Sequence, residues 1–105
     1  MNNLDKATDS FVAVLLETEE YQNYARELAR VKQYPELKAQ IDDFRKRNYE
    51  MQSGPVDLAA IDRFEAEYQT IRENPIVADF LAAEVDFCRM MQDIGLRITS
   101  AFRFE

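Results

Sequence analysis

The sequence predicts an all-α protein of four to five helices, arranged as a helical bundle with a long C-terminal helix. Glycine and proline, the residues that make tight turns, number only two and three among 105 residues, which leaves little material for β-hairpins. Leu, Ala, Glu, Arg, Gln and Met, which lose least on entering a helix, are abundant. Residues 1–105 suit one domain, and a hydrophobic content of 47% can supply a core.

The first half of the chain predicts amphipathic helices separated by recognisable start signals. Residues 4–16 place apolar side chains three and four positions apart, which makes one helical face. Thr18 resembles the N-cap of a helix over residues 19–33, although the sequence leaves open whether the first two segments are separate helices or one bent helix. Pro35 suits the first turn of the next helix. The inward stripe of that helix consists of Leu37, Ile41, Phe44, Asn48 and Met51.

Two more helices follow the loop segment QSGPVD. Asp57 is the expected N-cap of the fourth helix, and Pro75 begins the last one, because the residue before a proline is pushed out of the α region. The last helix, over residues 75–102, spans roughly 42 Å at 1.5 Å per residue, whereas a compact domain of this length is about 33 Å across. The inner face of the fourth helix is expected to hold Leu58, Ile61, Phe64, Tyr68 and Ile71.

The last helix is apolar around about 240° of its circumference, at about 100° per residue. A helix covered over so wide an arc packs against its own domain with one side and against a partner with the other. A second copy of the chain is the simplest partner, since twofold homodimers are the commonest assembly. We therefore expect a homodimer or larger assembly. The predicted interface consists of Phe80, Leu81, Glu84, Phe87, Cys88, Met91, Ile94 and Ile98.

Glu84 and Gly95 are unusual residues for this apolar helix. A buried carboxylate at position 84 needs a partner or a proton. It is expected to be an anchor bonded to another helix, with Arg45, Arg47, Arg63 or Arg72 as candidate partners; the alternatives are a register device at an oligomer interface, or a catalytic acid or metal ligand. A glycine inside a helix costs about 1 kcal/mol relative to alanine. Close approach of another helix explains it, and a kink is the alternative.

Composition argues against several classes of function. The chain has no histidine and one cysteine, so it lacks the residues of histidine-based catalytic pairs and of the common zinc sites. We expect no catalytic residue, no metal and no cofactor. The net charge of -7 repels phosphate backbones and anionic lipid. The chain has neither a secretory signal pattern nor a membrane-spanning run, so we expect a cytoplasmic protein without membrane insertion.

The segment FRKRNY is the best argument for an RNA-associated module. Arg45, Lys46 and Arg47 stand in a row beside Tyr49, and basic residues with an aromatic neighbour are typical of nucleic-acid binding. Three consecutive residues fan out over about 200° of a helix, however, and carboxylates surround them. A solvated helix face is the preferred interpretation, and we do not expect the chain to bind nucleic acid directly.

The order of these features resembles the YlbF/YmcA/YheA family of small helical bacterial proteins. The resemblance covers nearly the whole chain: an early LDKA helix, the block from ETEEYQNYARELARVKQ to NYEMQ, the SGP break, and the terminal NPIVADFLAAEVDFCRMMQDI. Asn74, Pro75, Leu81, Ala83 and Glu84 match the family's N-P…L-x-A-E arrangement.

The resemblance implies an all-α, oligomeric, non-enzymatic regulator of the cytoplasm. It also implies other proteins of a regulatory complex as partners, because members influence competence, biofilm formation and sporulation through complexes that affect RNA processing. Some members are associated with iron–sulfur clusters through cysteines. This chain has only Cys88, so that property does not carry over. The family branch, the cellular process, the partner proteins and the choice between dimer and tetramer stay open at this point.

Overall fold

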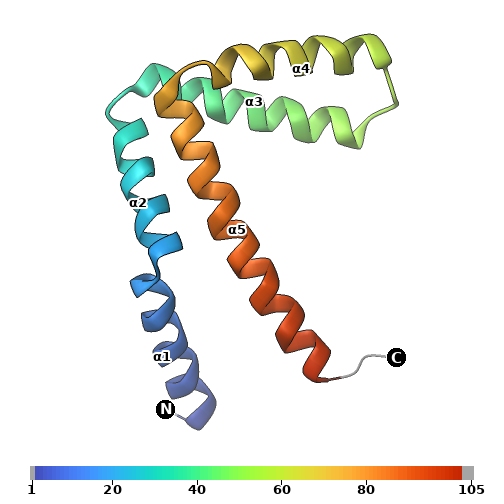
Figure 1. The fold of residues 1–105 in the computed structure, drawn as a ribbon. Helices are drawn as coiled ribbons and strands as arrows, with labels where there is room; N and C mark the ends of the chain where they lie inside the picture. Colours follow the sequence, from blue (N-terminus) through green and yellow to red (C-terminus); the bar gives the residue numbers. More distant parts are fainter. Residues whose placement is uncertain (1, 103–105) are drawn as a thin grey trace. The chain divides into compact units, whose positions relative to one another are not determined.

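The computed structural model describes residues 2–102 and forms five helices over them, with no strand in this range (Figure 1). The all-α prediction is confirmed, and the long C-terminal helix is present. Most helix ends fall within one or two residues of their predicted positions. The helices are α1 (Asn3–Glu17), α2 (Glu19–Lys32), α3 (Pro35–Ser53), α4 (Leu58–Arg72) and α5 (Pro75–Ala101).

Short polar side chains fix where the helices begin. Thr18 has extended backbone angles (φ -67°, ψ 150°) and therefore separates α1 from α2. Its hydroxyl accepts a hydrogen bond from the Tyr21 amide at 3.2 Å, which satisfies one of the free donors at the start of α2. The Asp57 carboxylate caps α4 by accepting from the amides of residues 59 and 60 at 3.1 and 3.2 Å. Asn74 accepts from the Ile76 amide at 2.9 Å in the same way.

The chain divides into two compact units, which we describe separately. Unit 1 comprises Met1–Arg26 and Ala82–Glu105, and unit 2 comprises Glu27–Leu81. Within unit 2, α3 and α4 lie side by side as an antiparallel hairpin (Figure 1). The Phe44 ring stacks on Phe64 with centroids 4.2 Å apart and on Tyr68 with centroids 4.8 Å apart. Stacked aromatic rings of this kind hold the hairpin together.

The core of unit 2 collects apolar side chains from three different helices. Val31 of α2, Ile41 of α3, and Val77 and Phe80 of α5 are each at most 3% exposed. The Arg45 guanidinium lies over the Phe80 ring at 5.5 Å from its centroid, an arrangement in which a cation is attracted to the ring face.

Ion pairs join the helices of unit 2 at its surface. Arg30 of α2 contacts Asp79 of α5 at 3.0 Å. Arg47 of α3 pairs with Asp43 of its own helix at 3.0 Å and with Glu67 of α4. The hydrogen bond from Arg47 to Glu67 raises the pKa of the Arg47 guanidinium. These pairs are partly exposed, so they contribute less to stability than the aromatic contacts do.

Unit 1 is held by a small aromatic cluster. Phe87 of α5 stacks on Tyr24 with centroids 5.2 Å apart and meets Tyr21 at 5.8 Å in a tilted arrangement. Both tyrosines belong to α2. Ala83 is buried as well. By contrast, no residue of α1 is buried, although its apolar residues follow the predicted helical spacing.

The prediction that Leu58 belongs to the inner face of α4 is wrong, since this side chain is 73% exposed. Leu58 stands in the first turn of α4, at the loop end of the hairpin, where a hollow lies between the two helices. Ile61, Phe64, Tyr68 and Ile71 are half-buried, as the prediction requires.

Gly95 has no close neighbour within the described chain. A Cβ atom built at this residue meets nothing within 4 Å, so no other part of the described chain approaches it closely. α5 nevertheless continues as a helix on both sides of it. The predicted close approach of another helix is therefore absent within this chain.

Candidate protein-interaction surface

Exposed apolar side chains are concentrated in unit 1. Ten large hydrophobic residues of α1 and of residues 85–102 are each between 39 and 72% exposed. An isolated exposed apolar residue needs no explanation, but a group from two neighbouring segments of one unit does. We call this group the apolar surface. It consists of Leu4, Phe11, Val12, Val14, Leu16, Val85, Met91, Leu96, Ile98 and Phe102.

The apolar surface is large for a chain of this length. Its exposed area is on the order of 900 Å², at about 150–200 Å² per large apolar side chain. The largest apolar patch on an ordinary monomer is about 300–600 Å², and a standard protein–protein interface buries about 800 Å² on each partner. This total exceeds the largest apolar patch of an ordinary monomer, and its ten residues occupy more than one side of α1 and of α5, at about 100° per residue.

A hollow lies between α1 and the end of α5 within this surface. Its volume is about 610 Å³. Phe11 of α1 lines it on one side, and Ile94, Ile98 and Phe102 are among the residues that line it on the other. An inserted apolar side chain would find mostly carbon atoms there, with Arg97 at the margin.

The structure distributes the eight residues of the predicted interface over three environments. Phe80 is in the core of unit 2 at 2% exposure. Leu81, Glu84, Phe87 and Ile94 are half-buried, and Phe87 is occupied by its contacts with the two tyrosines of α2. The exposed members are Cys88, Met91 and Ile98.

Glu84 is half-buried rather than fully buried. Its role as an anchor bonded to another helix, or as a register device at an oligomer interface, stays a prediction.

The contribution of α1 to the apolar surface was not predicted from the sequence, although the spacing of its apolar residues indicates an apolar face. Leu4, Ala7, Phe11 and Val14 follow one another at intervals of three, four and three residues. From the sequence, this spacing indicated one helical face without indicating what covers it. Spacing identifies an apolar face, but it does not distinguish a face covered by the same chain from one left exposed.

The basic segment at residues 45–47 forms no continuous cationic patch. Arg45 lies over the Phe80 ring, and Arg47 pairs with Asp43 and Glu67. These contacts direct the two guanidinium groups to their own unit. The preferred interpretation was a solvated helix face, and Arg45 and Lys46 are exposed whereas Arg47 is half-buried.

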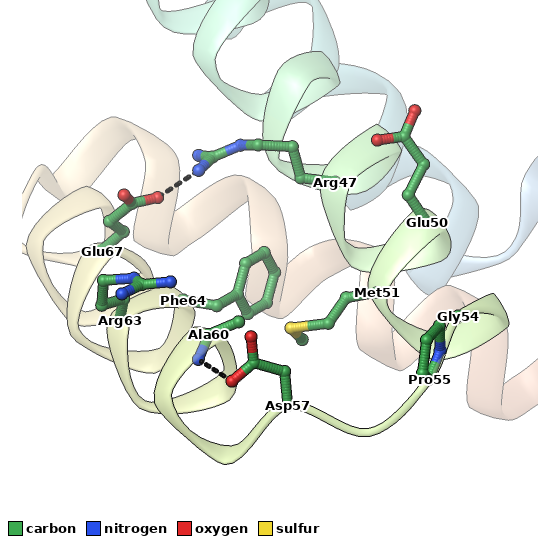
Figure 2. Close-up of a pocket in the computed structure, with 10 residues that line it drawn as sticks. All are labelled: Arg47, Glu50, Met51, Gly54, Pro55, Asp57, Ala60, Arg63, Phe64 and Glu67. Atoms are coloured by element: carbon green, nitrogen blue, oxygen red, sulfur yellow. Dashed lines mark hydrogen bonds and ion pairs between the residues drawn. The ribbon is translucent and has the colours of Figure 1, made fainter.

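A second hollow, of about 420 Å³, lies at the loop end of the α3–α4 hairpin (Figure 2). Figure 2 shows the Phe64 ring and the Met51 sulfur facing it, with the Arg47–Glu67 ion pair bridging the two helices beside it. The Asp57 carboxylate in its lining already accepts hydrogen bonds from the start of α4. The Arg47–Glu67 pair thus joins the two helices of the hairpin beside the hollow, and Asp57 serves the start of α4.

Residues 2–102 contain no cluster of three or more Cys, Asp or Glu side chains placed to hold a metal ion. None of the helices described over this range combines the length and apolar character needed to cross a membrane.

The fold defines a small all-helical protein with a broad apolar surface on α1 and the end of α5. A family model described as control of competence regulator ComK, YlbF/YmcA, matches residues 4–102. The chain therefore belongs to the YlbF/YmcA family, as the resemblance of its motifs predicted. Membership in this family indicates a regulatory, non-enzymatic role.

A curated relative supports the assignment over the whole length of the chain. A UPF0342 protein of Caldicellulosiruptor bescii is 23% identical over 110 aligned positions, which cover 100% of this chain and 92% of the relative. No solved structure matches the chain with significance.

Proposed function

We propose that this chain is a cytoplasmic regulatory protein that forms a homodimer, or a larger assembly, through the apolar surface and acts by binding other proteins. The observation behind the proposal is the exposure of ten large apolar side chains on a single unit of the chain. Left in water, an area on the order of 900 Å² would cost about 20 kcal/mol relative to burial, at about 25 cal/mol per Å². A second copy carries the same surface and can cover it symmetrically.

The family assignment supports the regulatory part of the proposal. The family is described by control of the competence regulator ComK. We extend this to the processes that the resemblance implies, which are competence, biofilm formation or sporulation. In this proposal the chain acts within protein complexes that affect RNA processing.

Static light scattering of the purified full-length chain tests self-association. We expect the mass of a dimer or larger at micromolar concentration. Met91→Asp should weaken the assembly by 100-fold or more, because both copies would then bury a charge, at a cost of several kcal/mol each. A wild-type chain that stays monomeric would refute the proposal.

Leu58→Asp is the matched control for Met91→Asp. Leu58 is also a large exposed apolar residue, but it belongs to unit 2 and lies outside the apolar surface. Leu58→Asp introduces the same negative charge at a position that stays exposed, so the mass of the assembly should not change. Dissociation of both variants alike would point to a general effect of added charge and would contradict the proposed location.

Affinity capture from the native cytoplasm tests the regulatory part. The wild-type chain and Met91→Asp serve as paired baits, and the recovered proteins are identified by mass spectrometry. We expect components of RNA processing to be enriched on the wild-type bait. Recovery of no such component on either bait would contradict this part of the proposal and leave the self-association result unaffected.

A further inference from the structure

Five residues near the end of α5 form a single line of exposed positions. They recur at intervals of three and four residues, which is the spacing of a helix that packs along another helix. At about 100° per residue they fall within about 80° of the helix circumference. All five are exposed, and Phe102 directly follows the last residue of α5. We call them the heptad line: Cys88, Met91, Gly95, Ile98 and Phe102.

The sides of α5 around the heptad line differ in chemistry. On one border, Phe87 contacts the tyrosines of α2, and Ile94 shares a hollow with Phe11 of α1. This border faces the chain's own helices. The charged residues of α5 between positions 85 and 101 lie opposite the heptad line, about 140–180° from its centre, and are Asp86, Arg89, Asp93 and Arg97. Ile98 and Phe102 of the heptad line also line the hollow with Phe11, whereas Cys88, Met91 and Gly95 do not. The heptad line is thus the uncharged, exposed sector of α5 on which a second helix can pack.

We propose that α5 of a second copy packs antiparallel along the heptad line, with each Met91 seated over Gly95 of the other copy. This inference rests on the proposed self-association and names its geometry. The twofold axis then passes at the level of residue 93, midway between Met91 and Gly95. Cys88 of each copy lies opposite Ile98 of the other.

Side-chain size favours the antiparallel arrangement. It places large residues opposite small ones, Met91 against Gly95 and Ile98 against Cys88, so the two helices interdigitate without a void. A parallel pair in register would instead put Gly95 against Gly95 and leave a gap, with Met91 against Met91 directly beside it. Close packing therefore selects the antiparallel pair.

Charge favours the same arrangement. Glu84 continues the spacing of the heptad line towards the start of α5. A parallel pair would bring the two Glu84 carboxylates together, and like charges at close range repel. In the antiparallel pair they are about 27 Å apart along the helix axis, at 1.5 Å per residue. The helix dipoles also oppose one another favourably in this orientation.

The open space at Gly95 is what this packing requires. A Cβ atom there meets nothing within 4 Å inside the chain, so the glycine is not needed for the chain's own packing. A glycine in mid-helix is unfavourable by about 1 kcal/mol, and the seat for Met91 of the second copy offsets this cost.

The α5 pair alone is short, since the line from Cys88 to Phe102 extends only about 21 Å. The exposed stripe of α1, which includes Leu4, Phe11 and Val14, flanks it in each copy. Two α1 and two α5 segments would together make an antiparallel four-helix arrangement. The exposed area of both stripes, on the order of 600–700 Å² at about 150–200 Å² per large apolar side chain, approaches the roughly 800 Å² per partner of a stable dimer. The occupant of the apolar surface is therefore a second copy of the chain.

Disulfide trapping of the full-length chain tests the geometry. The predicted pair places residues 88 and 98 of different copies opposite each other, within the Cα separation of about 7 Å that a disulfide tolerates. Ile98→Cys, which keeps the native Cys88, should form covalent dimers under oxidised glutathione, and peptide mapping should show an 88–98 bond. Residues 88 and 98 of one helix are about 15 Å apart and cannot form this bond within a chain.

Three controls, two with a single cysteine and one with two, separate this result from random collisions. Native Cys88 alone should not form a covalent dimer, because the two copies of residue 88 are about 15 Å apart in the antiparallel pair. Ile98→Cys combined with Cys88→Ala should also form no covalent dimer, because the two copies of residue 98 are likewise about 15 Å apart. Leu96→Cys with native Cys88 should also remain uncrosslinked, since Leu96 is exposed but lies about 120° away from the centre of the heptad line.

Gly95→Leu provides a second readout that needs no cysteine. It fills the seat for Met91 and should weaken the dimer at least tenfold, while the monomer stays folded because the position is open. Gly95→Leu with undiminished dimer affinity would overturn the proposed contact.

The outcomes distinguish the geometry from the proposed function. Efficient cross-linking through native Cys88 alone would show a parallel pair and overturn the inference, although self-association would stand. A non-covalent dimer that gives no 88–98 bond would place the interface elsewhere, which also overturns the inference. A monomer at all concentrations would refute the proposed self-association itself.

Discussion

The rings of Tyr24 and Phe87 lie nearly parallel, 14° apart in plane and 5.2 Å between centroids. This contact ties α2 to α5 within unit 1 and determines which sector of α5 faces the chain's own helices. The neighbouring sector, from Cys88 to Phe102, is exposed as a consequence. The location of the proposed interface thus depends on the orientation that this aromatic pair gives to α5.

Phe87→Ala should lower the free energy of unfolding by about 2–3 kcal/mol, somewhat less than the loss for a fully buried phenylalanine, because Phe87 is only half-buried. The measurement is urea denaturation, carried out in a Met91→Asp background so that dimer dissociation does not contribute. Phe102→Ala is the matched control, since this phenylalanine is 69% exposed and should change stability by less than about 0.5 kcal/mol. Equal losses in the two variants would contradict the assigned role of Phe87.

Phe44→Ala should destabilise the α3–α4 hairpin by about 3 kcal/mol, because Phe44 stacks on both Phe64 and Tyr68. Amide hydrogen exchange should show the loss of protection in residues 35–72. Tyr49→Ala removes an aromatic ring from the same helix, but that ring is 73% exposed, so protection should remain. A hairpin equally protected in Phe44→Ala would show that the stack does not stabilise it.

Thr18→Ala should cost about 1 kcal/mol of stability, because the Tyr21 amide at the start of α2 loses its side-chain acceptor. Thr18→Ser keeps the hydroxyl and should restore most of the loss. Circular dichroism during thermal unfolding measures both variants. If serine were no better than alanine, the capping hydrogen bond would not be the cause.

Arg30 and Arg47 give a prediction about pH. Hydrogen bonds to Asp79 and to Glu67 raise the pKa of the respective guanidinium groups. A raised pKa of a basic group stabilises the fold at every pH below its unfolded value, and this contribution is lost only as pH rises through the folded value. The chain also has no histidine. The thermal midpoint should therefore change little between about pH 6 and about pH 8. A steep change within that range would show that a group other than these two arginines controls stability there.

Much of the fold could be predicted from local signals in the sequence. Thr18, Pro35, Asp57 and Pro75 each mark a helix start through a hydrogen bond or a fixed dihedral angle that acts within a few residues. Such local effects need no knowledge of the tertiary structure. The separation of α1 from α2, left open by the sequence, depended on whether Thr18 would adopt an extended conformation, as it does.

The environment of individual side chains was harder to predict because it depends on contacts distant in sequence. Spacing placed Leu58 and Phe64 on one face, yet only Phe64 packs, since Leu58 stands at the open end of the hairpin. Phe80 and Met91 both belong to the apolar arc of α5, but Phe80 is buried while Met91 is 39% exposed. Periodicity identifies an apolar sector without identifying what covers it.

Sedimentation velocity of the wild-type chain over a range of concentrations tests the central claim most directly. The chain has a mass of 12.3 kDa. We predict a species of at least twice that mass at micromolar concentration, which shifts towards the single chain on dilution and is absent in Met91→Asp. A wild-type protein that sediments as a single chain at every concentration would contradict the claim that the apolar surface is an interface between copies.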